Sequence, residues 1–363
     1  MVSELHPILG FPMSTQTVSV SLIDCGARLD LPADQFVFPN IQGHERLQIP
    51  SYSFLITHPS KGRVLFDLSL RNDIQNLAPV MANRINNPSI GWRVAVTQDV
   101  PDTLVANGIA LPEIQSIFWS HQHFDHIGDP SKFPSSTELV VGPGFTEAYT
   151  PGYPDNPDSP VNSADLEGRR VIELDFDNSE ESISIGRFKA FDWFEDGSFY
   201  LLDVPGHAAG HICGFARVKP DSFVLMGGNC AHHPGEFRPS KIAPVPKDLI
   251  PLHVAVHSKQ MSVCQGTVTE RINKKHAIER SPVYKAATMF THDIDKYQWS
   301  LEGIQELDAC ENVLVIIAHD GGILPVLQRA NVLFPKGELT EWQHNELKEA
   351  VKWVFLSDLA VLT

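Results

Sequence analysis

The sequence predicts an α/β fold in which strands outnumber helices. Short β-branched and aromatic runs, each bounded by Gly, Pro, Asn or Asp, recur through the first two thirds of the chain, whereas helical periodicity is confined to a few segments. The 363 residues, 42% of them hydrophobic, suffice for one large core, and no linker, repeat or low-complexity tract divides them. We therefore expect a single domain over residues 1–363, with two domains as the alternative.

The expected strands end at turn residues, and the last of them is apolar throughout, which predicts burial on both faces. In order they are Val18–Asp24, Tyr52–His58, Arg63–Leu68, Ile114–Trp119, Glu138–Val141, Arg170–Leu174, Phe199–Val204, Ile212–Val218, Phe223–Met226 and Val313–Ala318. Helices are expected over Asp73–Arg84, Tyr284–Leu307 and Glu341–Val354. The Pro- and Asp-rich segment 150–165 predicts a surface loop. Residues 238–312 interrupt the strand pattern, so we expect an insert of helix and loop.

Charge and composition exclude several classes of partner. The net charge is −16 and no run of Lys or Arg occurs, which argues against a nucleic-acid-binding protein. The apolar runs are far shorter than the roughly 20 residues that span a bilayer, and the first residues lack the pattern of a secretory signal. The five cysteines form no C-x-x-C pair, which is typical of a reducing compartment. We expect a cytoplasmic protein that acts on a small molecule, as a monomer or homodimer, without nucleic acid or membrane.

The densest group of metal donors among the 16 histidines follows the strand that ends at Trp119. His121, His123, Asp125 and His126 form an H-x-H-x-D-H motif, and imidazole and carboxylate suit Zn²⁺, Fe²⁺ or Mn²⁺. His121 and His123 are two residues apart and point the same way in an extended turn. Asp125 and His126 would then face a second ion, about 3.5–4 Å from the first in two-metal sites. A polar surface loop with incidental histidines is the alternative.

Three more donor groups follow apolar strands. His207 comes after a glycine that permits a sharp turn, and would complete a three-histidine set. His211 lies further on, as an orienting residue or simply a structural histidine. Asn229 and His232 follow the strand Phe223–Met226, and His319 follows the last strand. Because sites of sheet-based folds assemble at strand ends, we expect these groups to meet.

Together these motifs resemble the metallo-β-lactamase superfamily over about residues 18–320. The resemblance implies an αββα sandwich with a binuclear site at one edge and a helical and loop insert near it. It assigns His121, His123 and His207 to the first metal and Asp125, His126 and His319 to the second, with Asp67 as a supporting acid. Two divalent ions are expected, with Zn²⁺ favoured and Fe or Mn as alternatives. The stretch from Gly227 to Pro239 is most similar to fungal lactonase- or thioesterase-type members, which are found with secondary-metabolite pathways.

The sequence departs from the family pattern at two positions. Asn229 stands where the family has a metal-bridging Asp, so it would be a neutral and weaker ligand. We expect a weaker second ion and a bound water of higher pKa. The chain is then a modified binuclear enzyme, an enzyme using one metal for other chemistry, or an Asp→Asn variant made to trap a ligand. His232 stands where lactonases place a Tyr, and either donates a proton or braces its loop.

The leading hypothesis is metal-dependent hydrolysis of an ester, lactone or thioester, for example in a polyketide-like secondary metabolite. The metals would polarise the carbonyl and supply hydroxide. Asp125 would orient the nucleophile, and His232 is the candidate acid. No G-x-S-x-G motif is present, which disfavours a serine nucleophile. The alternatives are a non-hydrolytic oxygenase, isomerase or cyclase on the same scaffold, or an inactivated protein that binds without turnover.

Two segments are expected to shape the substrate pocket. One is the loop 151–165. The other is the insert 238–312, predicted to cap the site. Its larger apolar residues either line the pocket or pack onto the sheet: Met261, Tyr284, Met289, Phe290, Tyr297 and Trp299.

Overall fold

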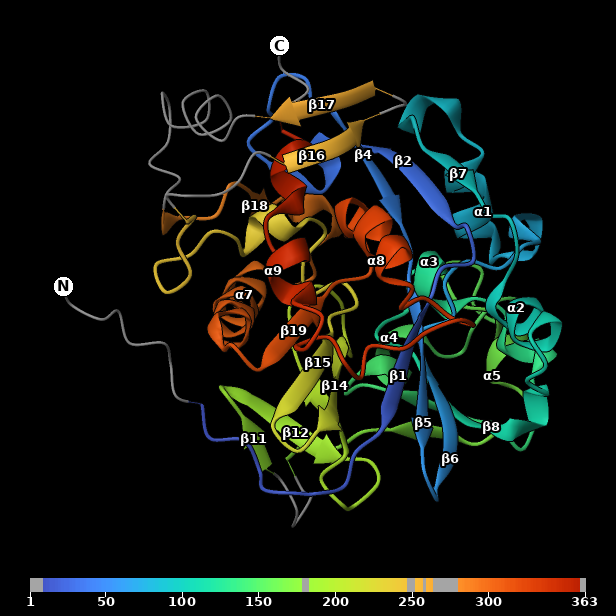
Figure 1. Cartoon of the computed structure of the whole chain (residues 1–363). Helices are drawn as coiled ribbons and strands as arrows, with labels where there is room; N and C mark the ends of the chain where they lie inside the picture. Colours follow the sequence, from blue (N-terminus) through green and yellow to red (C-terminus); the bar gives the residue numbers. More distant parts are fainter. Residues whose placement is uncertain (1–8, 178–182, 247–251, 257–258, 264–279, 360–363) are drawn as a thin grey trace.

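Two six-stranded sheets form the centre of the molecule in the computed structural model, which describes residues 9–177, 183–246, 252–256, 259–263 and 280–359 (Figure 1). The first sheet has the order β1-β5-β6-β8-β9-β10, with bounds Ser19–Ile23, Ser53–His58, Gly62–Phe66, Ile114–Phe118, Glu138–Val141 and Val171–Glu173. The second has the order β11-β12-β13-β14-β15-β19, with bounds Ile183–Ile185, Phe188–Asp192, Phe199–Asp203, Ile212–Lys219, Ser222–Met226 and Val313–Ile316. In each sheet antiparallel hairpins lead into parallel strands, β6 beside β8 and β15 beside β19.

The sheets pack face to face, and helices cover their outer sides. Phe66 and Phe118 of the first sheet share a buried cluster with Phe199 and Met226 of the second. On the far side of the second sheet lies α7 (Ile294–Ala309), whose apolar residues join a separate cluster with β13 and β15. α2 (Val100–Ala106) belongs to the cluster outside the first sheet. The four layers make the expected αββα sandwich, visible in Figure 1 as α7, two sheets and α2 in succession.

A smaller region with its own core lies against one end of the sandwich. Its three strands are β2 (Arg28–Pro32), β4 (Arg46–Pro50) and β7 (Arg93–Ala95), in the order β4-β2-β7. β3 (Val37–Phe38) pairs with β18 (Lys285–Ala286), and α1 (Pro79–Ile85) packs alongside. A two-stranded ribbon, β16 (Leu252–Val256) with β17 (Lys259–Val263), lies nearby in Figure 1. We refer to the β4-β2-β7 sheet and α1 as the N-terminal wall.

Helix boundaries differ from the sequence prediction for local reasons. The helix expected over Asp73–Arg84 begins only at Pro79, which takes the first helical turn where its missing N–H costs nothing. The helix expected over Tyr284–Leu307 begins at Ile294, because the Asp293 side chain caps it by accepting from the Lys296 N–H. Within Glu341–Val354 only α9 (Leu347–Val351) is α-helical. The remaining described α-helices are α3 (Phe124–Ile127), α4 (Phe145–Tyr149), α5 (Ser163–Leu166), α8 (Leu324–Ala330) and α9 (Leu347–Val351).

Among the described residues, no helix has the length and apolarity to cross a membrane. Several parts of the predicted insert 238–312 lie outside the described residues, namely 247–251, 257–258 and 264–279. The side chain of Met261 also lies outside them. The single-domain organisation and the capping role of the insert stay predictions.

Candidate metal centre

The strand ends bring the predicted donors to one edge of the sandwich. His121 and His123 follow β8, and Asp125 and His126 lie in the one-turn helix α3 behind them. The other three donors follow strands of the second sheet: His207 after β13, Asn229 after β15 and His319 after β19. All seven side chains are buried except that of His123, which is half-buried. The structure therefore brings all seven predicted metal donors together. The distances between their ligand atoms and their hydrogen bonds show whether they could hold an ion.

The first half of the centre is a set of three histidines whose ring nitrogens converge. His121 Nε2 lies 2.9 Å from His123 Nδ1, and His207 Nε2 lies 3.1 Å from each of these atoms. A tetrahedral ion with metal–nitrogen bonds of about 2.0–2.1 Å holds its nitrogens about 3.3 Å apart. The three nitrogens thus have nearly the spacing of ligands around one ion.

Burial keeps these three rings neutral, as ligands must be. It lowers the pKa of His121 and His207 well below the usual range, and neighbouring histidines lower them further. Burial also lowers the pKa of His123 to about 4. Neutral imidazoles offer lone pairs, and three lone pairs directed at one point repel each other unless a cation lies between them.

The second half contains Asp125, His126 and His319. Asp125 Oδ2 lies 3.4 Å from His319 Nε2 and 3.7 Å from His126 Nε2, and the three ligand atoms could hold one ion. Burial by itself would raise the pKa of Asp125, but His126 and His319 lower it below its ordinary value. The carboxylate is therefore charged, and this half differs from the first in carrying a negative ligand.

Hydrogen bonds on the outer nitrogens fix which nitrogen of each ring faces inward. His126 Nδ1 donates to Asp67 Oδ2 over 2.7 Å, and His319 Nδ1 donates to the Pro50 carbonyl over 2.7 Å. Asp67 also accepts from the backbone N–H of Ser120 over 2.7 Å, which joins it to the strand end that carries His121. Both rings thereby direct Nε2 into the site, the usual arrangement of metal-binding histidines.

Asn229 lies beside the second half, and its side-chain oxygen is available. Its backbone N–H donates to His211 Nε2 over 3.1 Å, while His211 Nδ1 donates to the Val204 carbonyl. His211 therefore orients the loop rather than acting as a ligand. Asn229 Oδ1 and His126 Nε2 are both buried and make no hydrogen bond within the described part of the chain. Two orphaned buried atoms beside an ionised carboxylate fit a divalent cation.

His232 lies next to the centre with both ring nitrogens free of hydrogen bonds among the described residues. Its ring centroid is 4.8 Å from that of His207, and burial lowers its pKa well below the usual range. The backbone N–H groups of His232 and His233 donate to Glu236, which holds this loop in place. His232 is thus a neutral imidazole that lines the cavity and is positioned by ring contacts with Phe36 and Tyr297.

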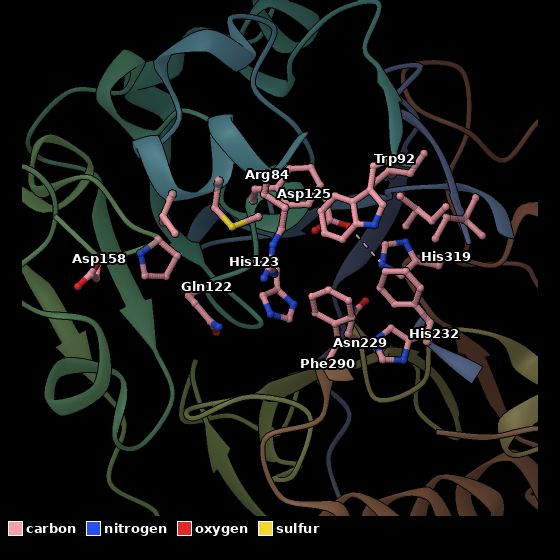
Figure 2. A pocket seen from close by; sticks show the side chains of 18 residues that line it. Arg84, Trp92, Gln122, His123, Asp125, Asp158, Asn229, His232, Phe290 and His319 are labelled. Atoms are coloured by element: carbon pink, nitrogen blue, oxygen red, sulfur yellow. Dashed lines mark ion pairs between the residues drawn. The ribbon is translucent and has the colours of Figure 1, made fainter. Parts of the chain in front are cut away.

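A cavity of about 240 Å³ opens onto both halves (Figure 2). His123, Asp125, Asn229, His232 and His319 form its floor. Its remaining lining is mainly apolar and comes largely from the N-terminal wall: Leu29, Leu31, Phe36, Ile49, Val80, Met81, Arg84, Trp92, Gln122, Phe124, Asp158, Pro160 and Phe290. The loop 151–165 contributes Asp158 and Pro160, and Phe290 is the contribution of the insert. The sequence contains no motif that marks the N-terminal wall, because its residues are ordinary apolar positions.

Four of the other named insert residues are described by the structure, and none of the four lines the cavity. Tyr284 and Tyr297 are buried, Met289 is 67% exposed, and Trp299 stacks under Arg187. Tyr297 belongs to a close contact that positions His207: an added Cβ at Gly206, where φ is +123°, would meet the Tyr297 nitrogen at 2.1 Å. The backbone N–H groups of His292 and Asp293 also donate to the carbonyls of His207 and Gly206. The start of α7 is therefore bonded to the loop that presents a metal donor.

A third group of potential donors, His44, His233 and Asp358, already has partners within the protein. His233 Nδ1 accepts from the Gly235 N–H over 3.0 Å, and His44 Nδ1 lies 2.6 Å from the Tyr284 hydroxyl. We therefore assign no ion to this group.

Comparison with known proteins agrees with this architecture. The family model of the metallo-beta-lactamase superfamily matches residues 47–220. "Metallo-hydrolase mfmC" of Annulohypoxylon moriforme is 39% identical over 97% of this chain and 90% of its own length. "Gamma-lactamase FDB1" of Fusarium pseudograminearum is 38% identical over 99% of this chain and 86% of its own. The chain belongs to the metallo-β-lactamase superfamily, and its relatives of similar length are named as hydrolases.

One group of relatives is much longer. "Cytochrome P450 monooxygenase mpaDE'" of Penicillium brevicompactum is 39% identical over 98% of this chain, which spans only 39% of that protein's length. Among solved structures, AiiA of B. thuringiensis superposes with a TM-score of 0.56 at 16% identity, over 88% of this chain and 98% of its own. That structure has N-decanoyl-L-homoserine bound at its active site. At this identity the likeness confirms the fold.

Proposed function

We propose that this protein is a metal-dependent hydrolase that opens a small lactone or lactam, with esters and thioesters as related substrates. The observation that carries the proposal is the pair of adjacent donor sets, three neutral histidines beside Asp125, His126 and His319, under a mainly apolar cavity. The lactam follows from the name of the relative from Fusarium, and the lactone from a solved neighbour named as an N-acyl homoserine lactone hydrolase, which has N-hexanoyl-L-homoserine bound as its product.

The residues divide the work between binding ions and handling the substrate. Two divalent ions, Zn²⁺ before Fe or Mn, would be held by His121, His123 and His207 and by Asp125, His126 and His319, with Asn229 as a neutral ligand. When bound, such ions polarise a carbonyl and make water nucleophilic at neutral pH. The side chains of the cavity exclude water and hold the apolar part of the substrate against this floor.

Asp125 and His232 are the proposed catalytic residues. The carboxylate of Asp125 faces the cavity with its charge kept, so it can orient a nucleophile by accepting its hydrogen bond. His232 is neutral and its ring nitrogens have no hydrogen-bond partner among the described residues, so one of them can accept the proton released by the attacking water and pass it to the leaving oxygen or nitrogen.

A non-hydrolytic reaction is the second candidate, because Asn229 supplies less charge than the carboxylate expected there. A weakly held second ion would leave open positions on the first, and a redox-active ion would then allow oxygen chemistry. Metal analysis separates the two: bound iron with oxygen consumption favours this alternative, while zinc favours hydrolysis.

The test is metal analysis combined with a substrate panel. The purified protein is expected to contain up to two equivalents of metal and to hydrolyse members of a set of γ-lactones, γ-lactams and acyl thioesters. Removal of metal with EDTA should abolish hydrolysis, and added Zn²⁺ or Mn²⁺ should restore it. Undiminished hydrolysis by rigorously metal-free protein would contradict the proposal. So would metal-loaded protein that is inactive on the whole panel.

A further inference from the structure

Arg84, at the end of α1, is a cationic side chain that lines the cavity. Its guanidinium carbon lies 5.8 Å from the ring centroid of Trp92 and 5.4 Å from that of Phe290. Within the described part of the chain the guanidinium of Arg84 makes no hydrogen bond and no ion pair. By comparison, Arg187 binds the carboxylates of Glu302 and Glu306, and Arg46 binds the Asp30 carboxylate and two backbone carbonyls. Arg84 is exposed; its guanidinium lies against two aromatic rings, and its N–H groups are open to solvent rather than bonded to an acceptor among the described residues.

The cavity around Arg84 offers little else that is charged. Among the described lining residues, Asp158 is the one other ionisable group besides Arg84, the histidines and the proposed ligand Asp125. It comes from the loop on another side of the cavity (Figure 2). No ion pair joins Asp158 to Arg84 among the described contacts. In a protein of net charge −16, an unpaired arginine above an apolar cavity is a site for an anion.

We propose that Arg84 determines substrate specificity by binding a carboxylate that the substrate carries apart from the bond that is cleaved. This inference rests on the proposed hydrolase function and names its substrate class: a lactone or lactam with an anionic side chain. A guanidinium placed over aromatic rings is already ordered, so less side-chain entropy is lost when its N–H groups bind a carboxylate. The body of the substrate would fill the apolar cavity and exclude water from this contact.

A purely structural role for Arg84 is the competing explanation. By lying over Phe290 as well as Trp92, the guanidinium joins the segment before α7 to the N-terminal wall. That role would affect all substrates alike, whether or not they carry a charge. A readout that compares charged and uncharged substrates therefore separates the two.

The experiment uses the metal-loaded protein and paired γ-lactones whose side chains end either in a carboxylate or in a methyl group, over two to six methylenes. The wild type is expected to prefer the carboxylate member by about 10-fold in kcat/KM at the best length, in the range of a charged hydrogen-bonded contact. In Arg84→Met, which keeps the apolar stem, the ratio should fall to about one. Arg84→Lys should lie between them, and 0.5 M NaCl should reduce the preference of the wild type only.

Arg329→Met is the matched control, because Arg329 is exposed on α8 outside the cavity and should leave the ratio as in the wild type. A wild-type ratio near one at every length, or an unchanged ratio in Arg84→Met, would overturn the inference while leaving hydrolysis intact. If no lactone, lactam or thioester of the panel is opened, the proposed function fails, and calorimetric binding of the same pairs still tests Arg84. Equal affinity for both members would then overturn it.

Discussion

The two halves of the metal centre use different donors. In the first half three neutral imidazoles bring their nitrogens within 2.9–3.1 Å of each other. In the second half the separations are 3.4 and 3.7 Å, and the donors include the ionised Asp125 and the amide Asn229. The first half would bind its ion through the lone pairs of neutral nitrogens, and the second mainly through the negative charge of Asp125. Because Asn229 leaves that charge to one carboxylate, the second half should hold its ion more weakly.

The largest effect is expected from removing one donor of each half in turn. His207→Ala should lose the tighter ion and reduce kcat by at least about 1,000-fold, because the first half then has only two nitrogens. His319→Ala should lose the weaker ion and cost about 100-fold. Metal content by mass spectrometry and kcat on one lactone are the measurements. Equal losses from the two variants would break the comparison.

Asn229→Asp sharpens the comparison by restoring the missing charge. The added carboxylate should tighten the second ion about 10-fold or more, measured by competition with a metal-binding dye, and leave the first ion within a few-fold of its affinity. Asn229→Ala, which removes the oxygen without adding charge, should change the second ion in the opposite direction. No change of affinity in Asn229→Asp would mean that this side chain does not contact an ion.

The smallest effect concerns Asp165, a buried carboxylate that lacks the neighbouring histidines that keep Asp125 ionised. Burial raises the pKa of Asp165 to about 7, and Arg71, 4.0 Å away, offsets only part of this. Since its pKa is higher in the folded than in the unfolded protein, its contribution to stability is present at low pH and is lost as pH rises through about 7. Asp165→Asn should therefore raise stability at pH 8 relative to the wild type by about 1–2 kcal/mol, with a smaller gain at pH 5.

Thermal unfolding at both pH values measures this difference. Asp155→Asn in the same loop, where the residue is exposed, should show no such dependence. A gain for Asp165→Asn that is equal at pH 5 and pH 8 would show that the carboxylate is already ionised in the folded protein.

The convergence of the proposed donors could be predicted because each lies directly after an apolar strand in a short motif. His121, His207 and His319 follow β8, β13 and β19, and the edge of a sandwich brings such strand ends together. The groups that accept hydrogen bonds from the outward-facing histidine nitrogens were only partly predictable. Asp67 was expected, but the Pro50 carbonyl that orients His319 lies far away in the chain. Hydrogen bonds to backbone carbonyls depend on how strands pack, which no local pattern encodes.

The substrate cavity could not be predicted to the same degree. Leu29, Leu31 and Ile49 alternate with outward residues as in any strand, so nothing in the sequence distinguishes a cavity wall from a core. Of the insert residues singled out, Phe290 lines the cavity, whereas Tyr284 and Tyr297 are buried in packing. Arg84 attracted no attention in the sequence, because its aromatic neighbours Trp92 and Phe290 come from other segments.

The backbone hydrogen bonds between the start of α7 and the His207 loop limit how this protein can be redesigned. The few residues that place Phe290 in the cavity continue directly into His292 and Asp293, whose N–H groups hold the backbone of His207 and Gly206. A change of length or direction in that segment would move a metal donor together with the cavity wall. Among the described contacts the N-terminal wall meets a donor at the end of β4, where the Pro50 carbonyl accepts from His319 Nδ1. Leu29 and Leu31 of β2, and Trp92 just before β7, line the cavity with their side chains, so these are the positions at which a library can vary substrate shape.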